Sequence, residues 1–195
     1  MGRPARFTEQ DLIAATSRIS ARLGAAHTTI ALIAAEAHAP VGSVYHRYPS
    51  KGALLAEAWI AAAESFGAQF RSILAQARTV DEAIEAALVT PRFAREDHAG
   101  GVLLFAHRRD DFLDEAPEES RARAAQQTSD VLHTISDAAK RLLPHDPRGR
   151  DKLSIALIGI PYGAVRMFLP HAVPPADLDG IIAAAARAAL SSAPH

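Results

Sequence analysis

Two short helical patterns on either side of a proline restrict the fold of the stretch from Thr28 to Lys51 more than any other feature of the chain. Thr28 and Thr29 can each cap a helix, because a threonine hydroxyl accepts hydrogen bonds from the free amides of a first turn. Ala39 precedes Pro40 and is therefore pushed out of the helical region, while Pro40 suits the first turn of a second helix. Apolar residues recur before this break at helical spacing, at Ile30, Ile33, Ala34 and Ala37.

The second helix is expected over residues 41–47, VGSVYHR, and Tyr48-Pro49 should end it. Two short helices joined by a tight turn predict a helix-turn-helix, whose second helix can enter the major groove of DNA. Hydroxyl, imidazole and cationic side chains in this stretch can contact phosphates or base edges, while Val41 could touch a thymine methyl and Val44 should face the core. The residues expected to contact DNA are Thr28, Thr29, Val41, Ser43, Tyr45, His46, Arg47 and Lys51.

About residues 7–56 resemble the DNA-binding domain of the TetR family of one-component transcriptional regulators. The family pattern Y-x-x-F/Y-x-x-K-x-x-L is present as Tyr45, Tyr48, Lys51 and Leu54. The chain departs from the family at two places. His38 stands where the family has a turn glycine, although histidine can also adopt a left-handed conformation. Ala31 and Leu32 replace an arginine or aspartate that the family often carries.

The resemblance implies a helix-turn-helix domain over residues 1–50 and a helical ligand-binding and dimerisation domain over residues 51–195. It also implies a homodimer, a near-palindromic double-stranded DNA operator and a small-molecule effector. Residues 50–143 would enclose the effector, and the last two helices would form the dimer interface. No cofactor is implied. The function expected is that of a repressor released from its operator by a small apolar or aromatic effector.

The composition favours an all-α fold, since alanine is abundant and aromatic residues make up only 6% of the chain. Thr8 and Asp11 form a capping-box pattern that should begin a helix ending near Leu23. A loosened segment is expected at residues 98–101, and Pro161 should kink the helix that contains it. Besides the helix-turn-helix pair, helices are expected over residues 8–23, 50–77, 79–90, 102–113, 117–143, 151–169 and 177–190.

The charge distribution separates a basic head from an acidic body. Residues 1–52 hold six Lys/Arg against three Asp/Glu, whereas residues 53–195 hold fifteen against nineteen, which gives the formal net charge of −1. Arg3 and Arg6 lie in a short basic arm that could reach a minor groove or remain a solvated tail. The N-terminal residues lack the apolar core of a signal peptide, and no uncharged run is long enough to span a bilayer. We therefore expect a cytoplasmic protein without a membrane partner.

The sequence offers no converging set of nucleophile, base and stabiliser, so we predict neither catalytic residues nor a metal site. His107, Asp110 and Asp111 could donate to a metal, but their arginine neighbours favour local ion pairs at a helix end. The chain has no cysteine, which excludes disulfides and thiolate metal ligands. An enzyme is therefore the least favoured class. The stronger alternative is a helical small-molecule-binding protein whose helix-turn-helix is non-functional.

Large side chains at helical spacing in the body are candidates for the ligand pocket, and each could instead be plain core. His107, Tyr162 and Arg166 would supply its polar groups. Ala156, Gly159 and Gly163 place small residues on one helix face, which could pair across a dimer axis or pack within one subunit. The candidate ligand-binding residues are Trp59, Phe66, Phe70, Phe93, Phe105, His107, Tyr162 and Arg166.

Overall fold

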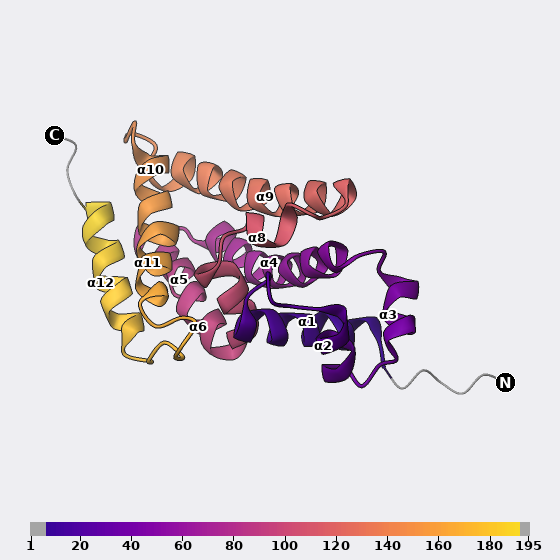
Figure 1. Cartoon of the computed structure of the whole chain (residues 1–195). Helices are drawn as coiled ribbons and strands as arrows, with labels where there is room; N and C mark the ends of the chain where they lie inside the picture. Colours follow the sequence, from indigo (N-terminus) through magenta and orange to yellow (C-terminus); the bar gives the residue numbers. More distant parts are fainter. Residues whose placement is uncertain (1–6, 192–195) are drawn as a thin grey trace.

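The computed structural model describes residues 7–191, and every regular element in that range is helical. The fold is therefore all-α, as the sequence predicts. Helices α1, α2 and α3 lie at one end of the molecule, and α11 and α12 lie at the other (Figure 1). Within residues 7–191, every helix falls short of the length or apolarity that crossing a bilayer requires.

The head consists of α1 (Glu9–Leu23), α2 (Ile30–Glu36) and α3 (Val41–Arg47). Thr8 and Asp11 form the predicted capping box, in which each side chain bonds the backbone amide of the other residue. Leu23 lies in the last turn of α1 and is 39% exposed, so it does not belong to the buried face of this helix. The core of the head contains Phe7, Leu12, Ala15, Ile30, Ile33, Ala34, Val44, Tyr48, Ala53 and Leu54.

Helix α4 (Lys51–Gln76) begins beside the head and runs through the body, which confirms the long helix predicted from Ser50. Ser50 caps it by accepting a hydrogen bond from the amide of Ala53. Helix α9 (Glu118–Leu142) lies alongside α4 for much of its length (Figure 1). The two helices are joined by an ion pair between Glu57 and Arg123, with a nitrogen–oxygen distance of 2.9 Å.

The middle of the chain departs from the prediction. It folds into α5 (Val80–Ala87), α6 (Val89–Glu96), α7 (His98–Gly101), the π-helix η1 (Val102–Ala106) and α8 (Asp110–Leu113). The segment expected to be loose at residues 98–101 is helical. Its glycines allow α6 to pack closely against it, since a Cβ atom on Gly101 would lie 2.8 Å from the Cα of Ala94 in α6. The single helix expected over residues 102–113 is interrupted at His107, which is extended with φ −101° and ψ 167°.

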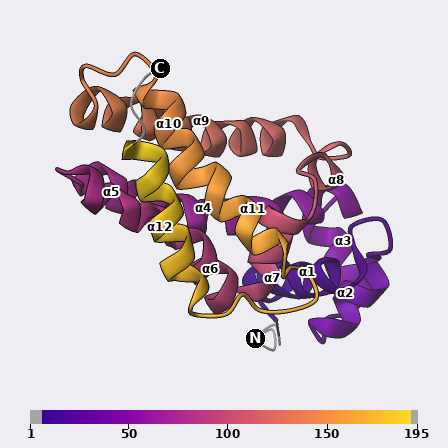
Figure 2. The same cartoon turned by 90° about the vertical axis from the view of Figure 1, so that its left-hand side faces the viewer.

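The last part of the chain consists of α10 (Gly149–Ser154), the π-helix η2 (Ile155–Gly159), α11 (Ile160–Arg166) and α12 (Leu178–Ser191). The predicted irregularity at Pro161 takes the form of this π-helical stretch, because proline has no amide to continue the i−4 ladder. Helices α11 and α12 lie side by side on the side of the molecule away from α3 (Figure 2).

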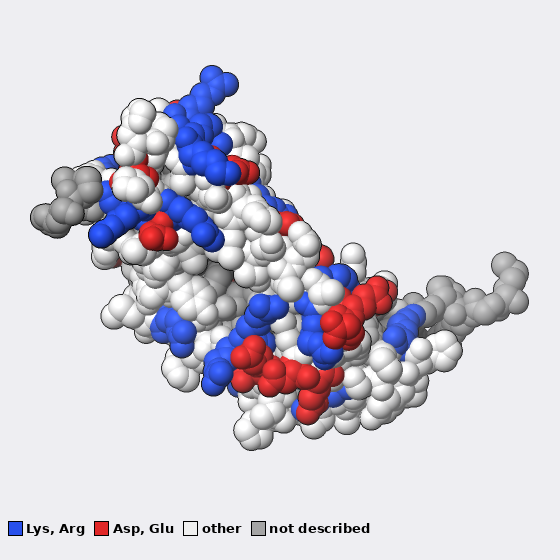
Figure 3. Space-filling model, turned by 90° about the horizontal axis from the view of Figure 1, so that it is seen from above, with Lys and Arg blue, Asp and Glu red and all other residues white. Residues whose placement is uncertain are grey.

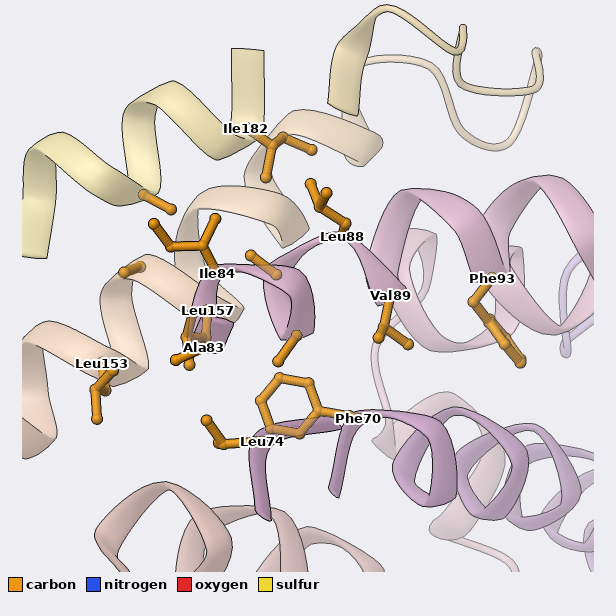
Figure 4. Packing of buried hydrophobic residues seen from close by; sticks show 14 of the residues in the cluster. Phe70, Leu74, Ala83, Ile84, Leu88, Val89, Phe93, Leu153, Leu157 and Ile182 are labelled. Carbon is orange, nitrogen blue, oxygen red and sulfur yellow. The ribbon is translucent and has the colours of Figure 1, made fainter. Parts of the chain in front are cut away.

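The largest core cluster joins α4, α5, α6, η2 and α12. Phe70 and Leu74 of α4 point toward Ile84 and Val89, and Ile182 of α12 covers the same cluster (Figure 4). A second cluster surrounds Trp59 and connects α4 to α8 and α9. Because α4 contributes to every cluster, including that of the head, it is the element that connects the two ends of the molecule.

Candidate functional site

The outer surface of α3 carries the polar side chains that the sequence assigns to DNA. Val44 is fully buried and anchors the helix to the head, as predicted, whereas Tyr45 is 58% exposed and Val41 is 43% exposed. His46 and Arg47 are also exposed, and Ser43 is half-buried. A short helix with one buried anchor and a polar outer surface has the geometry needed to enter a major groove.

The turn before α3 adopts the conformation that the sequence requires. His38 has a φ of 52°, the left-handed conformation expected at the position of the turn glycine. The amide of Ala39 donates to the carbonyl of Ala34 at 2.8 Å and closes the end of α2. Pro40 then caps α3 from outside the first turn, one position earlier than expected. The helix-turn-helix therefore forms with histidine in place of glycine.

Thr28 and Thr29 have different environments. Thr29 is exposed and caps α2, because its Oγ1 accepts a hydrogen bond from the amide of Leu32. Thr28 is only 1% exposed, and its hydroxyl donates to the carbonyl of Gly24 at 2.8 Å. The single proton of Thr28 is thus in use, so the hydroxyl of Ser20, 3.1 Å away, must donate to it. Thr28 neither caps α2 nor faces DNA, which corrects both predictions for this residue.

Two cations, Arg47 at the end of α3 and Lys51 at the start of α4, each have a contact within the head. Lys51 lies in the first turn of α4, and its Nζ is 3.4 Å from the carbonyl oxygen of Ala25. The guanidinium of Arg47 lies 4.8 Å from the ring centroid of Phe7, which orients it by a cation–π contact. The predicted basic arm with Arg3 and Arg6 lies outside the residues that the structure describes.

Other Lys and Arg side chains lie close to Asp and Glu side chains. Arg18 of α1 bonds Glu36 of α2 at 2.7 Å, and this hydrogen bond holds the pKa of Glu36 below its ordinary value. Over the body, Lys and Arg side chains lie next to Asp and Glu side chains on the face shown in Figure 3. On that face positive charges therefore alternate with negative charges and form no broad positive field.

A cavity of about 250 Å³ lies between α4, α9 and the two π-helical regions. Four predicted ligand-binding residues line it, namely Trp59, Phe66, Phe105 and Tyr162. Two lining residues from α9, Thr128 and Leu132, are exposed. The remaining lining residues are Ala63, Thr90, Leu104, Gln127, Thr128, Val131, Leu132 and Ile158.

The other four predicted ligand-binding residues lie outside this lining. Phe70 is fully buried behind Phe66, with ring centroids 6.0 Å apart, and Phe93 is also part of the core. His107 lies in a separate cleft beside Phe112, because the chain turns outward after η1. Arg166 is exposed, and its guanidinium lies over the ring of Tyr162. These placements remove all four residues from the set that lines the cavity.

The residues that α9 contributes to the cavity were not predicted to line it. Gln127, Thr128, Val131 and Leu132 occupy neighbouring positions on one face of that helix. Their spacing of three and four residues is visible in the sequence, but it is equally typical of a helix packed on the core. Thr90 was missed because it lies one residue before a proline, inside α6.

An exposed apolar surface covers part of η2, α11 and α12. Ile155 is 56% exposed, Met167 is 84% exposed and Ile181 is 64% exposed. Gly163 lies between Ile155 and Met167 in the sequence, and a Cβ atom added to it would meet nothing within 4 Å. Ala156, in contrast, is fully buried inside the subunit, so the small residues predicted to share one helix face do not share one environment.

The acidic run near His107 forms helix-end contacts. The amide of Arg108 donates to Asp111 at 3.1 Å, and Arg108 lies 3.7 Å from Asp110. Among the residues that the structure describes, no group of three or more His, Asp or Glu side chains is arranged to hold a metal ion.

Comparisons with known proteins agree with this geometry. Residues 12–58 match the sequence model of the family described as bacterial regulatory proteins, tetR family. A structure of the TetR family regulator PfmR from Thermus thermophilus aligns with a TM-score of 0.75 at 14% identity, covering 94% of this chain and 99% of that chain.

Two regulators of the FadR type have the same fold. FadR from Bacillus subtilis, in complex with stearoyl-CoA, aligns with a TM-score of 0.72 at 15% identity, covering 96% of this chain and 100% of that chain. The fatty acid degradation regulator FadR from Bacillus halodurans aligns with a TM-score of 0.71 at 16% identity, covering 95% and 96% of the two chains. A search of curated proteins finds no match to the sequence.

Proposed function

Since the chain belongs to the TetR family of bacterial regulatory proteins, we propose that it is a repressor that binds a near-palindromic operator as a homodimer. In this proposal a small apolar molecule enters the body and releases the operator. The observation that carries the proposal is the outer surface of α3. There the exposed Tyr45, His46 and Arg47 surround a helix anchored by the fully buried Val44.

The contacts divide into two kinds in this proposal. Thr29, Tyr45, His46 and Lys51 hold phosphates, since they lie at a helix end or at the edge of α3. Ser43, Val41 and Arg47 are assigned to base edges in this proposal. Thr28 is left out because it is buried.

Dimerisation would bury the exposed apolar surface around Ile155, Met167 and Ile181. An apolar surface of this kind is typical of a subunit interface. A two-fold axis through it would place two copies of α3 on successive half-sites, about one helical turn of DNA apart.

Helix α4 provides the connection between effector and DNA. Trp59 and Phe66 contribute to the cavity from α4, and Lys51 lies in the first turn of the same helix. A ligand that shifts α4 therefore moves a phosphate contact directly. A coupling free energy of about 1–3 kcal/mol would change operator affinity roughly 5- to 150-fold.

Titration of the DNA upstream of the chain's own gene tests the proposal, with shuffled DNA of equal length as the control. We expect a specific complex with two subunits per site, and a large loss of affinity for Tyr45→Ala. Equal affinity for the two DNAs would instead support the alternative of a ligand-binding protein with a non-functional helix-turn-helix.

The likeness to Bacillus subtilis FadR raises a second candidate effector, because that protein was crystallised with stearoyl-CoA. The cavity of about 250 Å³ is below the range of about 300–1,000 Å³ common for drug-sized ligands, and it favours a smaller molecule. Addition of stearoyl-CoA to the operator complex separates the two candidates.

A further inference from the structure

Resting on the proposed function, we propose that the effector is an uncharged aromatic molecule whose hydroxyl group both donates and accepts hydrogen bonds. Among residues 7–191, no Asp, Glu, Lys or Arg side chain lines the cavity that would hold it. A charged ligand would lose its hydration there without gaining a partner of opposite charge. The effector is therefore expected to be neutral.

Aromatic rings form much of the cavity wall. Phe66 and Phe105 meet edge to face with ring centroids 5.3 Å apart, and Phe105 meets Tyr162 in the same way at 5.6 Å. Trp59 contributes a fourth ring from α4. A flat ring can extend this edge-to-face arrangement, which stabilises aromatic pairs beyond the area they bury. An aromatic ligand therefore suits the wall better than a flexible chain.

Two of the three hydroxyl groups in the lining, those of Thr128 and Tyr162, already use their protons. Thr128 donates its proton to the carbonyl of Ala124 at 3.3 Å, and Tyr162 donates to the carbonyl of Leu104 at 3.2 Å. Each hydroxyl keeps lone pairs that can accept another hydrogen bond. Toward a ligand, these two residues are therefore acceptors.

Gln127 has the opposite role. Its Oε1 accepts from the guanidinium of Arg71 at 3.3 Å, and this orientation is required because arginine has no acceptor. The amide nitrogen of Gln127 then remains as the donor. These three residues thus offer two acceptors and one donor on neighbouring parts of α9 and α11, and the hydroxyl of Thr90 in α6 can act as either.

A hydroxyl group matches this set better than other common groups. It can donate to Thr128 or Tyr162 and accept from Gln127. An ether or a carboxylate can only accept, so among Gln127, Thr128 and Tyr162 it can use only Gln127, and it faces the lone pairs of the two hydroxyls. An ammonium can only donate, and it carries a charge into a lining without a carboxylate.

Three guanidinium groups lie near the cavity but do not line it. Arg109 lies 5.6 Å from the ring centroid of Trp59, and Arg166 lies 5.6 Å from that of Tyr162. Arg71 contacts the cavity only through Gln127. A carboxylate could reach one of them only if a lining side chain moved aside, so this ligand class is the main rival to be tested.

A matched set of probes tests the proposal on the full-length protein in the absence of DNA. The set is 4-butylphenol, 4-butylanisole, butylbenzene and 4-butylbenzoate, which differ in one ring substituent. Binding is measured by calorimetry, and the fluorescence of Trp59, the only tryptophan, reports whether the ligand occupies this cavity. We expect 4-butylphenol to bind about tenfold more tightly than its methyl ether, with 4-butylbenzoate weakest.

Variants assign the difference to the residues named. Thr128→Val and Tyr162→Phe should each reduce the preference for the phenol over the ether and leave butylbenzene affinity within about twofold. Thr134→Val is the control, because Thr134 donates to the carbonyl of Asp130 on the same helix and does not line the cavity. The full phenol preference should persist in this control.

Ether or carboxylate binding as tight as that of the phenol would overturn the proposal, as would binding of none of the four probes. Such results would leave operator recognition by the unliganded protein intact, because that is measured separately. Conversely, if 4-butylphenol binds as expected but operator affinity stays unchanged, the effector class stands and ligand-released repression fails.

Discussion

A Cβ atom added to Gly52 would lie 2.3 Å from the carbonyl oxygen of Glu115. The first turn of α4 therefore packs directly on the backbone of the loop between α8 and α9. Because Lys51 precedes this glycine, the position of a proposed phosphate contact depends on where that loop lies. This contact connects the start of α4, next to the head, with the loop that leads into α9, and both helices line the cavity.

Gly52→Ala should lower the free energy of unfolding by about 1–3 kcal/mol, since the new methyl group meets backbone that must move. Gly67→Ala on the same helix is the control, because its Cβ would meet only the guanidinium of Arg71 within 3.0 Å. That change should be neutral or stabilising by up to about 1 kcal/mol, through helix propensity. Chemical denaturation measures both, and equal stability of the two variants would contradict the packing argument.

Lys51→Ala should weaken operator and random DNA alike and lower the slope of log affinity against log salt by about one unit. The reason is that one phosphate contact and its released counterion are lost. Tyr45→Phe should also affect both DNAs equally, without changing the salt slope. Fluorescence anisotropy at several salt concentrations measures these slopes, and an unchanged slope for Lys51→Ala would place its cation away from DNA.

Ser43→Ala and Arg47→Ala should cost about 1–3 kcal/mol on the operator and alter the preferred base, with little effect on random DNA. Selection from a randomised DNA pool shows the change in preference. Each variant must remain a folded dimer for the comparison to hold. If both variants behave like Lys51→Ala, base reading lies elsewhere, for example in the arm with Arg3 and Arg6.

Ile155→Glu should raise the dissociation constant of the dimer at least about tenfold, because an interface near a two-fold axis would bury two unpaired carboxylates. Gly163→Leu should act in the same direction through steric clash. Leu32→Glu is the matched control, since Leu32 is a 39% exposed apolar residue on the head. Analytical ultracentrifugation at several concentrations decides the matter, and equal dissociation constants for Ile155→Glu and the control would rule out this surface.

Tyr48→Phe should destabilise the protein by about 1 kcal/mol at neutral pH, because the hydroxyl of Tyr48 donates to Glu9 at 2.9 Å. Burial, and next this hydrogen bond, raise the pKa of Tyr48 above its ordinary value of 10.0. The stabilisation is therefore complete below pH 10 and is lost at higher pH, where the unfolded chain releases the proton that the folded chain retains.

Melting temperatures of wild type and Tyr48→Phe should accordingly converge as the pH rises above 10. Tyr45→Phe controls for loss of a hydroxyl, since Tyr45 lies in the preceding turn of α3 and is 58% exposed. Its stability at neutral pH should match that of wild type. A gap between wild type and Tyr48→Phe that stays constant above pH 10 would contradict the assignment.

The parts of the fold that were predicted correctly are those governed by local chemistry. Thr8 caps α1, α4 begins directly after Ser50, Pro117 precedes α9, and His38 takes the left-handed turn. These outcomes depend on a few neighbouring residues, so a single sequence contains the necessary information.

The parts that were missed depend on contacts between distant segments. Gly101 is helical because another helix approaches it closely, although two adjacent glycines locally favour a loop. Phe70 and Phe66 have the same spacing pattern, yet only Phe66 reaches the cavity. Gln127 was missed for the same reason, since its role depends on Arg71, which is 56 positions away in the sequence.

The core of the head does not end where the sequence suggested a domain boundary, at residue 50. Ala53 and Leu54 of α4 pack with Phe7, Leu12 and Val44. An exchange of heads between regulators of this fold would therefore need to carry the first turn of α4 along with the helix-turn-helix. A junction placed after Leu54 would transfer the whole hydrophobic core of the head. A junction at residue 50 would instead combine core residues from two different parent proteins.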